Sequence, residues 1–170
     1  MKSLFSFFIY FSLLFFFNYE IFAAEYKGKV IKVVDGDTIH VLSDKGSKNK
    51  IRVLYIDAPE ITQTHGIKSK EFLEEIILGK VININVVEKE GKGGIDYYKR
   101  QLAEIYLYFD DKKPIFVNAK MIKSGNAWVY KRNRNNNYLL SLENHARTNK
   151  LGLWSSPAAM EPWVFRKQQQ

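Results

Sequence analysis

The sequence predicts a mainly β structure of the α+β class, with a closed barrel and helices packed on it. Five short runs rich in Val and Ile are each bounded by turn residues. One helical segment separates the third run from the fourth, and further helical segments follow the fifth. A five-stranded barrel of the OB-fold type with three packed helices has this strand count and order. An α+β sandwich is the alternative, because strand count alone does not choose between the two.

The strands are assigned from period-two patterns and from the turns between them. The first two runs flank Asp35-Gly36, and an Asp-Gly between two β-like runs is a strong hairpin signal. The third strand stops at Ala58-Pro59, because proline removes a backbone donor and restricts the residue before it. The expected strands are 26–34, 38–42, 50–56, 81–87 and 100–109.

The helices are assigned from apolar residues at helical spacing. Residues 67–78 place four apolar side chains on one face, and Gly79 follows where a helix commonly ends. A second helix is expected around 117–122, ended by Gly125, and a third around 138–146.

The first residues differ in composition from the rest of the chain. Lys2 is followed by an apolar run over 4–17, about 14 residues long, which suits a signal-peptide core better than a membrane span of about 20. Small residues at Ala23-Ala24 offer a cleavage site. We therefore expect a signal peptide over 1–24, a folded domain over 25–155 and a C-terminal tail over 156–170. The exported protein would be secreted, periplasmic or on the cell surface. An uncleaved membrane anchor and a buried helix are the alternatives for the apolar run.

The charge balance points to an anionic partner. Lys and Arg number 26 against 18 Asp and Glu, which gives a net charge of +8. Removing 1–24 takes away one charge of each sign and leaves this excess in the folded part. A basic domain attracts nucleic acid, anionic lipid or polyphosphate. Cysteine is absent, which excludes a disulfide framework, a thiolate metal site and a cysteine nucleophile.

Two acidic stretches carry the candidate chemistry. Asp37 lies just past the first hairpin turn, and Asp57 lies at the end of the third strand. If these strands are neighbours in one barrel, the two carboxylates can converge, and they repel each other unless a cation or proton lies between them. Neither has a histidine or cysteine beside it, so an all-oxygen site suits Ca²⁺ or Mg²⁺ rather than Zn²⁺. The plainer interpretation is that turn aspartates, including Asp35, bind their own backbone.

Two arginines supply positive charge for an anionic ligand. Arg52 lies within an apolar strand, where a guanidinium is costly unless it is paired, and its parity with Leu54 and Ile56 predicts an inward side chain. Arg100 precedes the last strand, and arginine forks match phosphate oxygens. Glu60 could orient or deprotonate a water molecule. Together these groups are the parts needed to cleave a phosphodiester.

These motifs together resemble the staphylococcal nuclease (thermonuclease, micrococcal nuclease) family. The resemblance covers roughly 26–155, in the same order, and rests on residues 35–38, 52–60, 96–100, 117–130 and 152–154. It implies an OB-fold barrel that binds Ca²⁺ and hydrolyses single- or double-stranded DNA and RNA, leaving 5′-hydroxyl and 3′-phosphate ends. It implies no protein partner, and we expect a monomer. A membrane would be a partner only if the N-terminal segment stays uncleaved.

The resemblance also assigns a role to each candidate residue. Asp37, Asp57 and the backbone carbonyl of Ala58 would bind calcium, and Asp35 would steady the turn. Glu60 would act on the attacking water, while Arg52 and Arg100 would bind the phosphate. The aromatic residues Tyr98, Trp128 and Tyr130 would contact the nucleotide, although core packing is an alternative for each.

The chain departs from the family pattern at one position beside the site. Lys99 stands where the family usually has glycine, which puts the aim of Arg100 in question. A non-catalytic nucleic-acid-binding barrel is the competing hypothesis. Such a barrel would be expected to have lost part of the site, whereas every part is present here.

Overall fold

A computed structural model describes residues 24–88, 94–109 and 113–170. The predicted signal peptide therefore lies outside the described residues, apart from Ala24. Within the described part of the chain, no helix is both long and apolar enough to cross a membrane. The strands are β1 (Ala24–Asp35), β2 (Thr38–Ser43), β3 (Lys48–Val53), β4 (Ile56–Asp57), β5 (Val81–Val86), β6 (Gln101–Leu107), β7 (Ile115–Phe116) and β8 (Trp128–Val129). The helices are α1 (Gly66–Ile77), α2 (Val117–Lys123), α3 (Asn137–Thr148) and α4 (Pro162–Gln168), with 3-10 turns η1 (Lys131–Asn133) and η2 (Gly152–Ser155).

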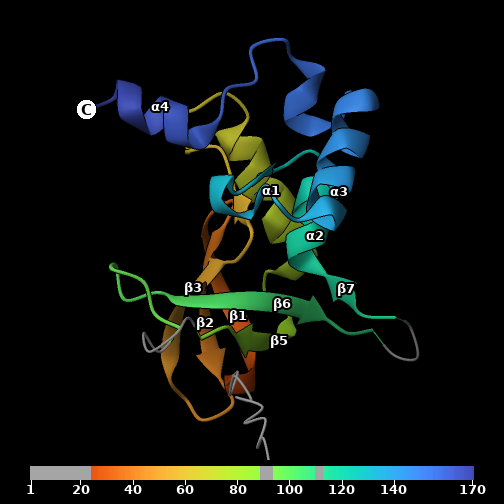
Figure 1. Ribbon diagram of the computed structural model, residues 1–170. Coiled ribbons are helices and arrows are strands. Elements are labelled where there is room, and N and C mark those ends of the chain that lie inside the picture. Colours follow the sequence, from red (N-terminus) through yellow and green to blue (C-terminus); the bar gives the residue numbers. More distant parts are fainter. Residues whose placement is uncertain (1–23, 89–93, 110–112) are drawn as a thin grey trace, which may run out of the picture.

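Five of these strands close into the predicted barrel. The order is β3-β2-β1-β5-β6, with neighbours antiparallel, and a parallel pairing of β3 with β6 closes the ring. Figure 1 shows this barrel below a group of helices. The closing pair aligns Ile51 with Gln101 and Val53 with Ala103. It therefore brings Arg52 and Arg100, almost fifty residues apart in sequence, to neighbouring strands.

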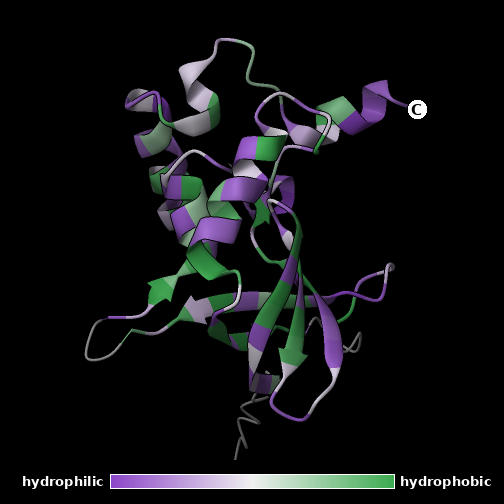
Figure 2. Ribbon diagram, turned by 180° about the vertical axis from the view of Figure 1, so that it is seen from behind, coloured by the Kyte–Doolittle hydropathy of each residue, from purple (hydrophilic) through white to green (hydrophobic). Residues whose placement is uncertain are grey.

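Alternation along the strands fills the barrel with branched aliphatic side chains. Ile39, Ile51, Ile84 and Ile105 have no exposed surface, and the residues between them are more polar and more exposed. Figure 2 shows hydrophobic and hydrophilic positions mixed along the strands in this way. The three predicted helices form as α1, α2 and α3, and Gly125 after α2 has a φ of 72°, the left-handed conformation typical of a helix end.

The predicted third strand over 50–56 is wrong in its second half. β3 ends at Val53, and the chain turns through Tyr55, whose φ is 68°. Ile56–Asp57 then pairs with Trp128–Val129 as a separate small sheet. The turn breaks the parity on which the orientation of Arg52 depended. Ile51 and Val53 point into the core, while Arg52 lies on the other face of β3 and points into the site.

Asn118 of α2 fixes this turn to the barrel. Its amide nitrogen donates to the carbonyl of Leu54 at 2.9 Å, and its side-chain oxygen accepts from the backbone N–H of Ile105 at 2.9 Å. Asn118 is fully buried, so these bonds satisfy backbone groups that would otherwise cost free energy. The stretch that carries Asp57 is thus held by α2 and β8 rather than by a continuous strand.

The C-terminal tail contains a helix that the sequence prediction missed. α4 begins at Pro162, and proline is favoured at the first helical position because its missing N–H has no helical partner there. Pro162 was therefore the feature of the sequence that could have predicted this helix. In Figure 1, α4 lies beside the loop that leads into α1, and the amide nitrogen of Gln63 in that loop donates to the carbonyl of Met160 at 2.6 Å.

Candidate active site

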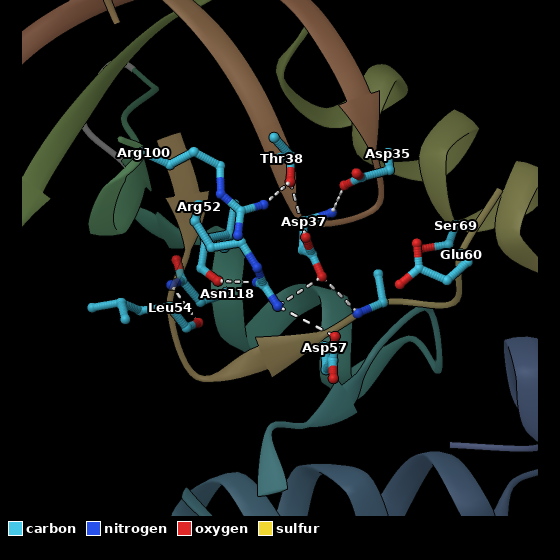
Figure 3. A network of polar contacts seen from close by, with 12 residues as sticks. Asp35, Asp37, Thr38, Arg52, Leu54, Asp57, Glu60, Ser69, Arg100 and Asn118 are labelled. Atoms are coloured by element: carbon cyan, nitrogen blue, oxygen red, sulfur yellow. Dashed lines mark hydrogen bonds and ion pairs between the residues drawn. The ribbon is translucent and has the colours of Figure 1, made fainter. Parts of the chain in front are cut away.

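Arg52 lies at the centre of a cluster of carboxylates. Its Nη2 is 3.0 Å from Oδ2 of Asp37 and 3.3 Å from Oδ1 of Asp57, and its Nη1 donates to the carbonyl of Val53 at 2.7 Å. Its side chain is 15% exposed. Figure 3 shows the two aspartates reaching this guanidinium, Asp37 from the turn between β1 and β2 and Asp57 from β4. The predicted convergence of Asp37 and Asp57 is therefore present in the structure.

The turn between β1 and β2 aims Asp37 through local hydrogen bonds. Oδ1 of Asp35 accepts from the backbone N–H of Asp37 at 2.9 Å, as in the turn chemistry considered for Asp35. Oδ2 of Asp37 accepts from the backbone N–H of Ala58 at 2.8 Å. Gly36 makes this approach possible, since a Cβ there would collide with the side chains of Ser69 and Ala58.

Burial disfavours the charged form of two carboxylates in the cluster. Burial, together with the charge of Asp37, raises the pKa of Asp35 to about 6. Burial also raises the pKa of Asp57, and the charge of Asp37 adds to this, although hydrogen bonds and charges from arginines oppose it. Carboxylates in such a setting are stabilised by additional positive charge.

Arg100 directly precedes β6 and reaches Thr38, the residue after Asp37. Its Nε donates to Oδ2 of Asp96 at 2.8 Å, and its Nη1 donates to Oγ1 of Thr38 at 3.2 Å. Oδ1 of Asp96 accepts from the backbone N–H groups of Tyr98 and Arg100, both at 2.9 Å. Burial raises the pKa of Asp96, but these hydrogen bonds outweigh it and hold the pKa below its usual value. Asp96, which the sequence prediction did not single out, therefore positions Arg100.

Lys99 adopts the backbone conformation that suits glycine. Its φ is 59°, and the turn places its N–H 3.0 Å from the carbonyl of Asp96. The turn forms despite the lysine, and Arg100 reaches the site. The departure from the family pattern therefore adds backbone strain without misdirecting Arg100.

Glu60 lies at the edge of the cluster, after β4. Its backbone N–H donates to Oε1 of Gln63 at 3.2 Å, and its carboxylate is 2.6 Å from Nη1 of Arg166 on α4. Arg166 also pairs with Asp57, at 2.7 Å. No local pattern in the sequence joins a residue of the tail to this site, because the link depends on how α4 packs.

A cleft of about 520 Å³ joins these groups. All six residues that the resemblance assigns to the metal, the water or the phosphate line it, and so do two of the predicted nucleotide contacts, Tyr98 and Tyr130. Arg132, Asn133 and Arg166 line it as well and were not predicted. Clustered positive charge over 131–134 was the available sequence signal for Arg132.

Trp128, the third residue that the resemblance assigns to the nucleotide, is not among the residues that line the cleft. It is 3% exposed, and its ring packs edge-on against Trp154 and Trp163, with centroids 4.1 and 6.1 Å away. The guanidinium of Arg147 covers it at 4.7 Å. This ring therefore packs in the interior, as the alternative interpretation had it, and presents no open face to a base.

The donor groups around Asp37 and Asp57 fit a hard cation. Their carboxylate oxygens are ligands that Ca²⁺ and Mg²⁺ prefer. Among the described residues no three side chains of His, Asp or Glu gather closely enough to hold a metal by themselves. The remaining ligands would have to be main-chain carbonyl, water or substrate oxygens, as in sites that leave positions open for a phosphate.

Comparison with known proteins agrees with this geometry. Residues 50–156 match the family described as "Staphylococcal nuclease homologue". The chain belongs to this family. It is 34% identical over 153 residues to an Escherichia coli O157:H7 protein named "Uncharacterized endonuclease", covering 90% of this chain and 93% of that protein. It is 33% identical over 150 residues to a Shigella flexneri protein named "Micrococcal nuclease", with 85% and 82% covered. Escherichia coli "Protein ParB" is 35% identical over 151 residues, with 85% and 81% covered.

The part that matches the staphylococcal nuclease homologue family does not contain the whole cleft. The match begins at Lys50 and ends at Ser156, so the turn at Asp35-Gly36-Asp37 precedes it and α4 follows it. Arg52, Asp57, Glu60 and Arg100 lie inside the matched range.

The strain at Lys99 can be measured by exchanging this residue. We expect the free energy of unfolding in urea to be about 1 kcal/mol higher for Lys99→Gly than for Lys99→Ala. An L-residue in the left-handed conformation costs roughly 1–2 kcal/mol, whereas glycine adopts it without this steric cost but loses more backbone entropy on folding. Both variants lack the lysine charge, so their difference isolates the backbone. Equal stability of the two would show that Lys99 is not strained.

Proposed function

We propose that this chain is a calcium-dependent nuclease that hydrolyses DNA and RNA with little sequence specificity and leaves 5′-hydroxyl and 3′-phosphate ends. The observation that carries the proposal is the convergence of Asp37 and Asp57 on Arg52, with Arg100 directly before β6, the strand that pairs with β3. Membership of the staphylococcal nuclease homologue family and the names of the relatives support hydrolysis of nucleic acid. The net charge of +8 favours a polyanionic substrate.

Asp37, Asp57 and the backbone carbonyl of Ala58 would hold the cation in this proposal. A bound divalent cation supplies positive charge at a phosphate oxygen and at the attacking water. The main chain already fixes Asp37 through Ala58, so its carboxylate needs little rearrangement to act as a ligand. Preorganisation of this kind lowers the cost of binding.

The two arginines would bind the scissile phosphate. Arg52 is held by the carbonyl of Val53 and Arg100 by the carboxylate of Asp96, so each guanidinium enters the cleft in a fixed orientation. Charge that develops on the phosphate oxygens in the transition state would meet these donors in place. Arginine suits this role because its planar fork pairs with two oxygens at once.

Glu60 would act on the water. The side chain is 38% exposed and lies at the edge of the cleft, where solvent can reach it. Its carboxylate would take a proton from water as the oxygen attacks phosphorus, and the bond from phosphorus to the 5′ oxygen would break. The 5′ oxygen would take a proton from a solvent water in the open part of the cleft and leave as a hydroxyl, and the phosphate would stay on the 3′ side.

Digestion in the presence and absence of metal tests the proposal. We expect the full chain to degrade plasmid DNA and RNA in Ca²⁺ and to stop when a chelator removes the ion. Product ends should accept phosphate from a polynucleotide kinase at their 5′ hydroxyl without prior phosphatase treatment. If the chain binds DNA or RNA but shows no cleavage that a chelator stops, the proposal is contradicted and a non-catalytic nucleic-acid-binding barrel is favoured.

Conservative replacement of each arginine tests the phosphate contacts. Arg52→Lys and Arg100→Lys keep the charge but lose the fork, and each should lower kcat by about 10²–10³, equivalent to about 2.7–4 kcal/mol for one lost transition-state donor. Lys123→Ala, on the exposed face of α2, is the matched control and should leave the rate unchanged. Rates within tenfold of the wild type in both lysine variants, with the fold intact by circular dichroism, would refute the arrangement.

We also propose that the protein is exported and that residues 1–24 are a signal peptide. The apolar run over 4–17 after Lys2 supports this. N-terminal sequencing of the native protein should give a mature start near Glu25. A start at Met1 would exclude cleavage.

A further inference from the structure

Arg166 of α4 pairs with the carboxylates of Asp57 and Glu60, which both belong to the proposed chemistry. These two residues lie far from Arg166 in the sequence. Its Nη2 is 2.7 Å from Oδ2 of Asp57, and its Nη1 is 3.1 Å from Oδ1 of the same residue. The same Nη1 is 2.6 Å from Oε1 of Glu60. A fork that pairs with both oxygens of a carboxylate is the strong form of this contact.

α4 is docked on the domain rather than extended into solvent. Pro162 is buried, and the ring of Trp163 packs edge-on against Trp128. Gln63, in the loop that also carries Glu60, binds the carbonyl of Met160. These contacts lie one to two helical turns from Arg166 and hold the helix where its guanidinium reaches the cleft.

The contacts leave no oxygen of Asp57 without an arginine. Oδ1 accepts from Arg52 at 3.3 Å and from Arg166 at 3.1 Å, and Oδ2 accepts from Arg166 at 2.7 Å. Arg166 thus takes up a lone-pair site on each oxygen, and Arg52 takes up a second site on Oδ1. A divalent cation bound at Asp57 would lie beside the Arg166 guanidinium, and the repulsion between these like charges makes the two compete for the carboxylate.

We propose that Arg166 is a further residue of the active site, an internal cation that competes with the divalent metal ion for Asp57 and Glu60. It is a positioning residue, since it acts through these carboxylates. It keeps them paired before a metal ion binds, and it lowers the affinity of the site for that ion. This inference rests on the proposed function. The Arg166 side chain is 43% exposed, so its guanidinium can leave the carboxylates without unpacking the core.

Calcium binding measured by titration calorimetry on the full chain tests the competition. We expect Arg166→Ala to bind Ca²⁺ about three- to tenfold more tightly than the wild type, because a partly exposed ion pair contributes modestly. Lys167→Ala removes the same charge from the next, exposed position of α4 and should change the affinity little. Arg166→Lys, which keeps the charge without the fork, should fall between the wild type and Arg166→Ala.

A second measurement follows α4 directly. Hydrogen exchange at the amides of 162–168 should become faster in the wild type when Ca²⁺ is added, because the helix loses its ion pairs, and should respond less in Arg166→Ala. Unchanged or weaker Ca²⁺ binding by Arg166→Ala would overturn the proposal. So would slower cleavage by this variant at saturating Ca²⁺, which would place Arg166 on the substrate phosphate instead.

The two proposals fail in different ways. Absence of chelator-sensitive cleavage by the wild type would overturn the proposed function. Retained cleavage with equal Ca²⁺ dissociation constants for wild type and Arg166→Ala would overturn only the role of Arg166.

Discussion

The site depends on one buried guanidinium between two carboxylates. Arg52 lies 3.0 Å from Asp37 and 3.3 Å from Asp57, and its charge offsets part of the cost of burying both aspartates. An arginine in this place is itself stable only because the carboxylates and the carbonyl of Val53 satisfy it. The three side chains come from β2 with its turn, β3 and β4, so their mutual pairing also fixes how these segments meet.

The framework around this cluster is built from main-chain contacts. The closing pair β3–β6 sets the separation of the two arginines, and Asn118 ties the turn after β3 to β6. Gly36 allows the β1–β2 turn to press against Ala58 and α1. A site held in this way keeps its geometry through the backbone, so substitutions at Gly36 or Asn118 would act on the chemistry indirectly.

Charge is distributed unevenly in a manner that suits the proposed chemistry. The chain as a whole is strongly basic, whereas the floor of the cleft is acidic, and its rim carries Arg100, Arg132 and Arg166. A polyanion is attracted to the rim, while a cation is attracted to the floor. Arg166 is one of the basic residues that line the cleft, but its guanidinium pairs with the carboxylates of Asp57 and Glu60.

The sequence by itself determined the five barrel strands approximately and three of the helices, and the resemblance it carries pointed to the barrel and to most of the charged residues in the cleft. Strand periodicity and the Asp35-Gly36 turn are local signals, and the spaced motifs carry the resemblance. Only the tertiary structure decided how Arg52 faces, because the turn at Tyr55 interrupts the alternation from which its direction was inferred. Burial decided that Trp128 packs in the interior. The contact of Arg166 with Asp57 joins residues 109 positions apart, and no local pattern encodes a contact that arises only when a terminal helix packs against a barrel.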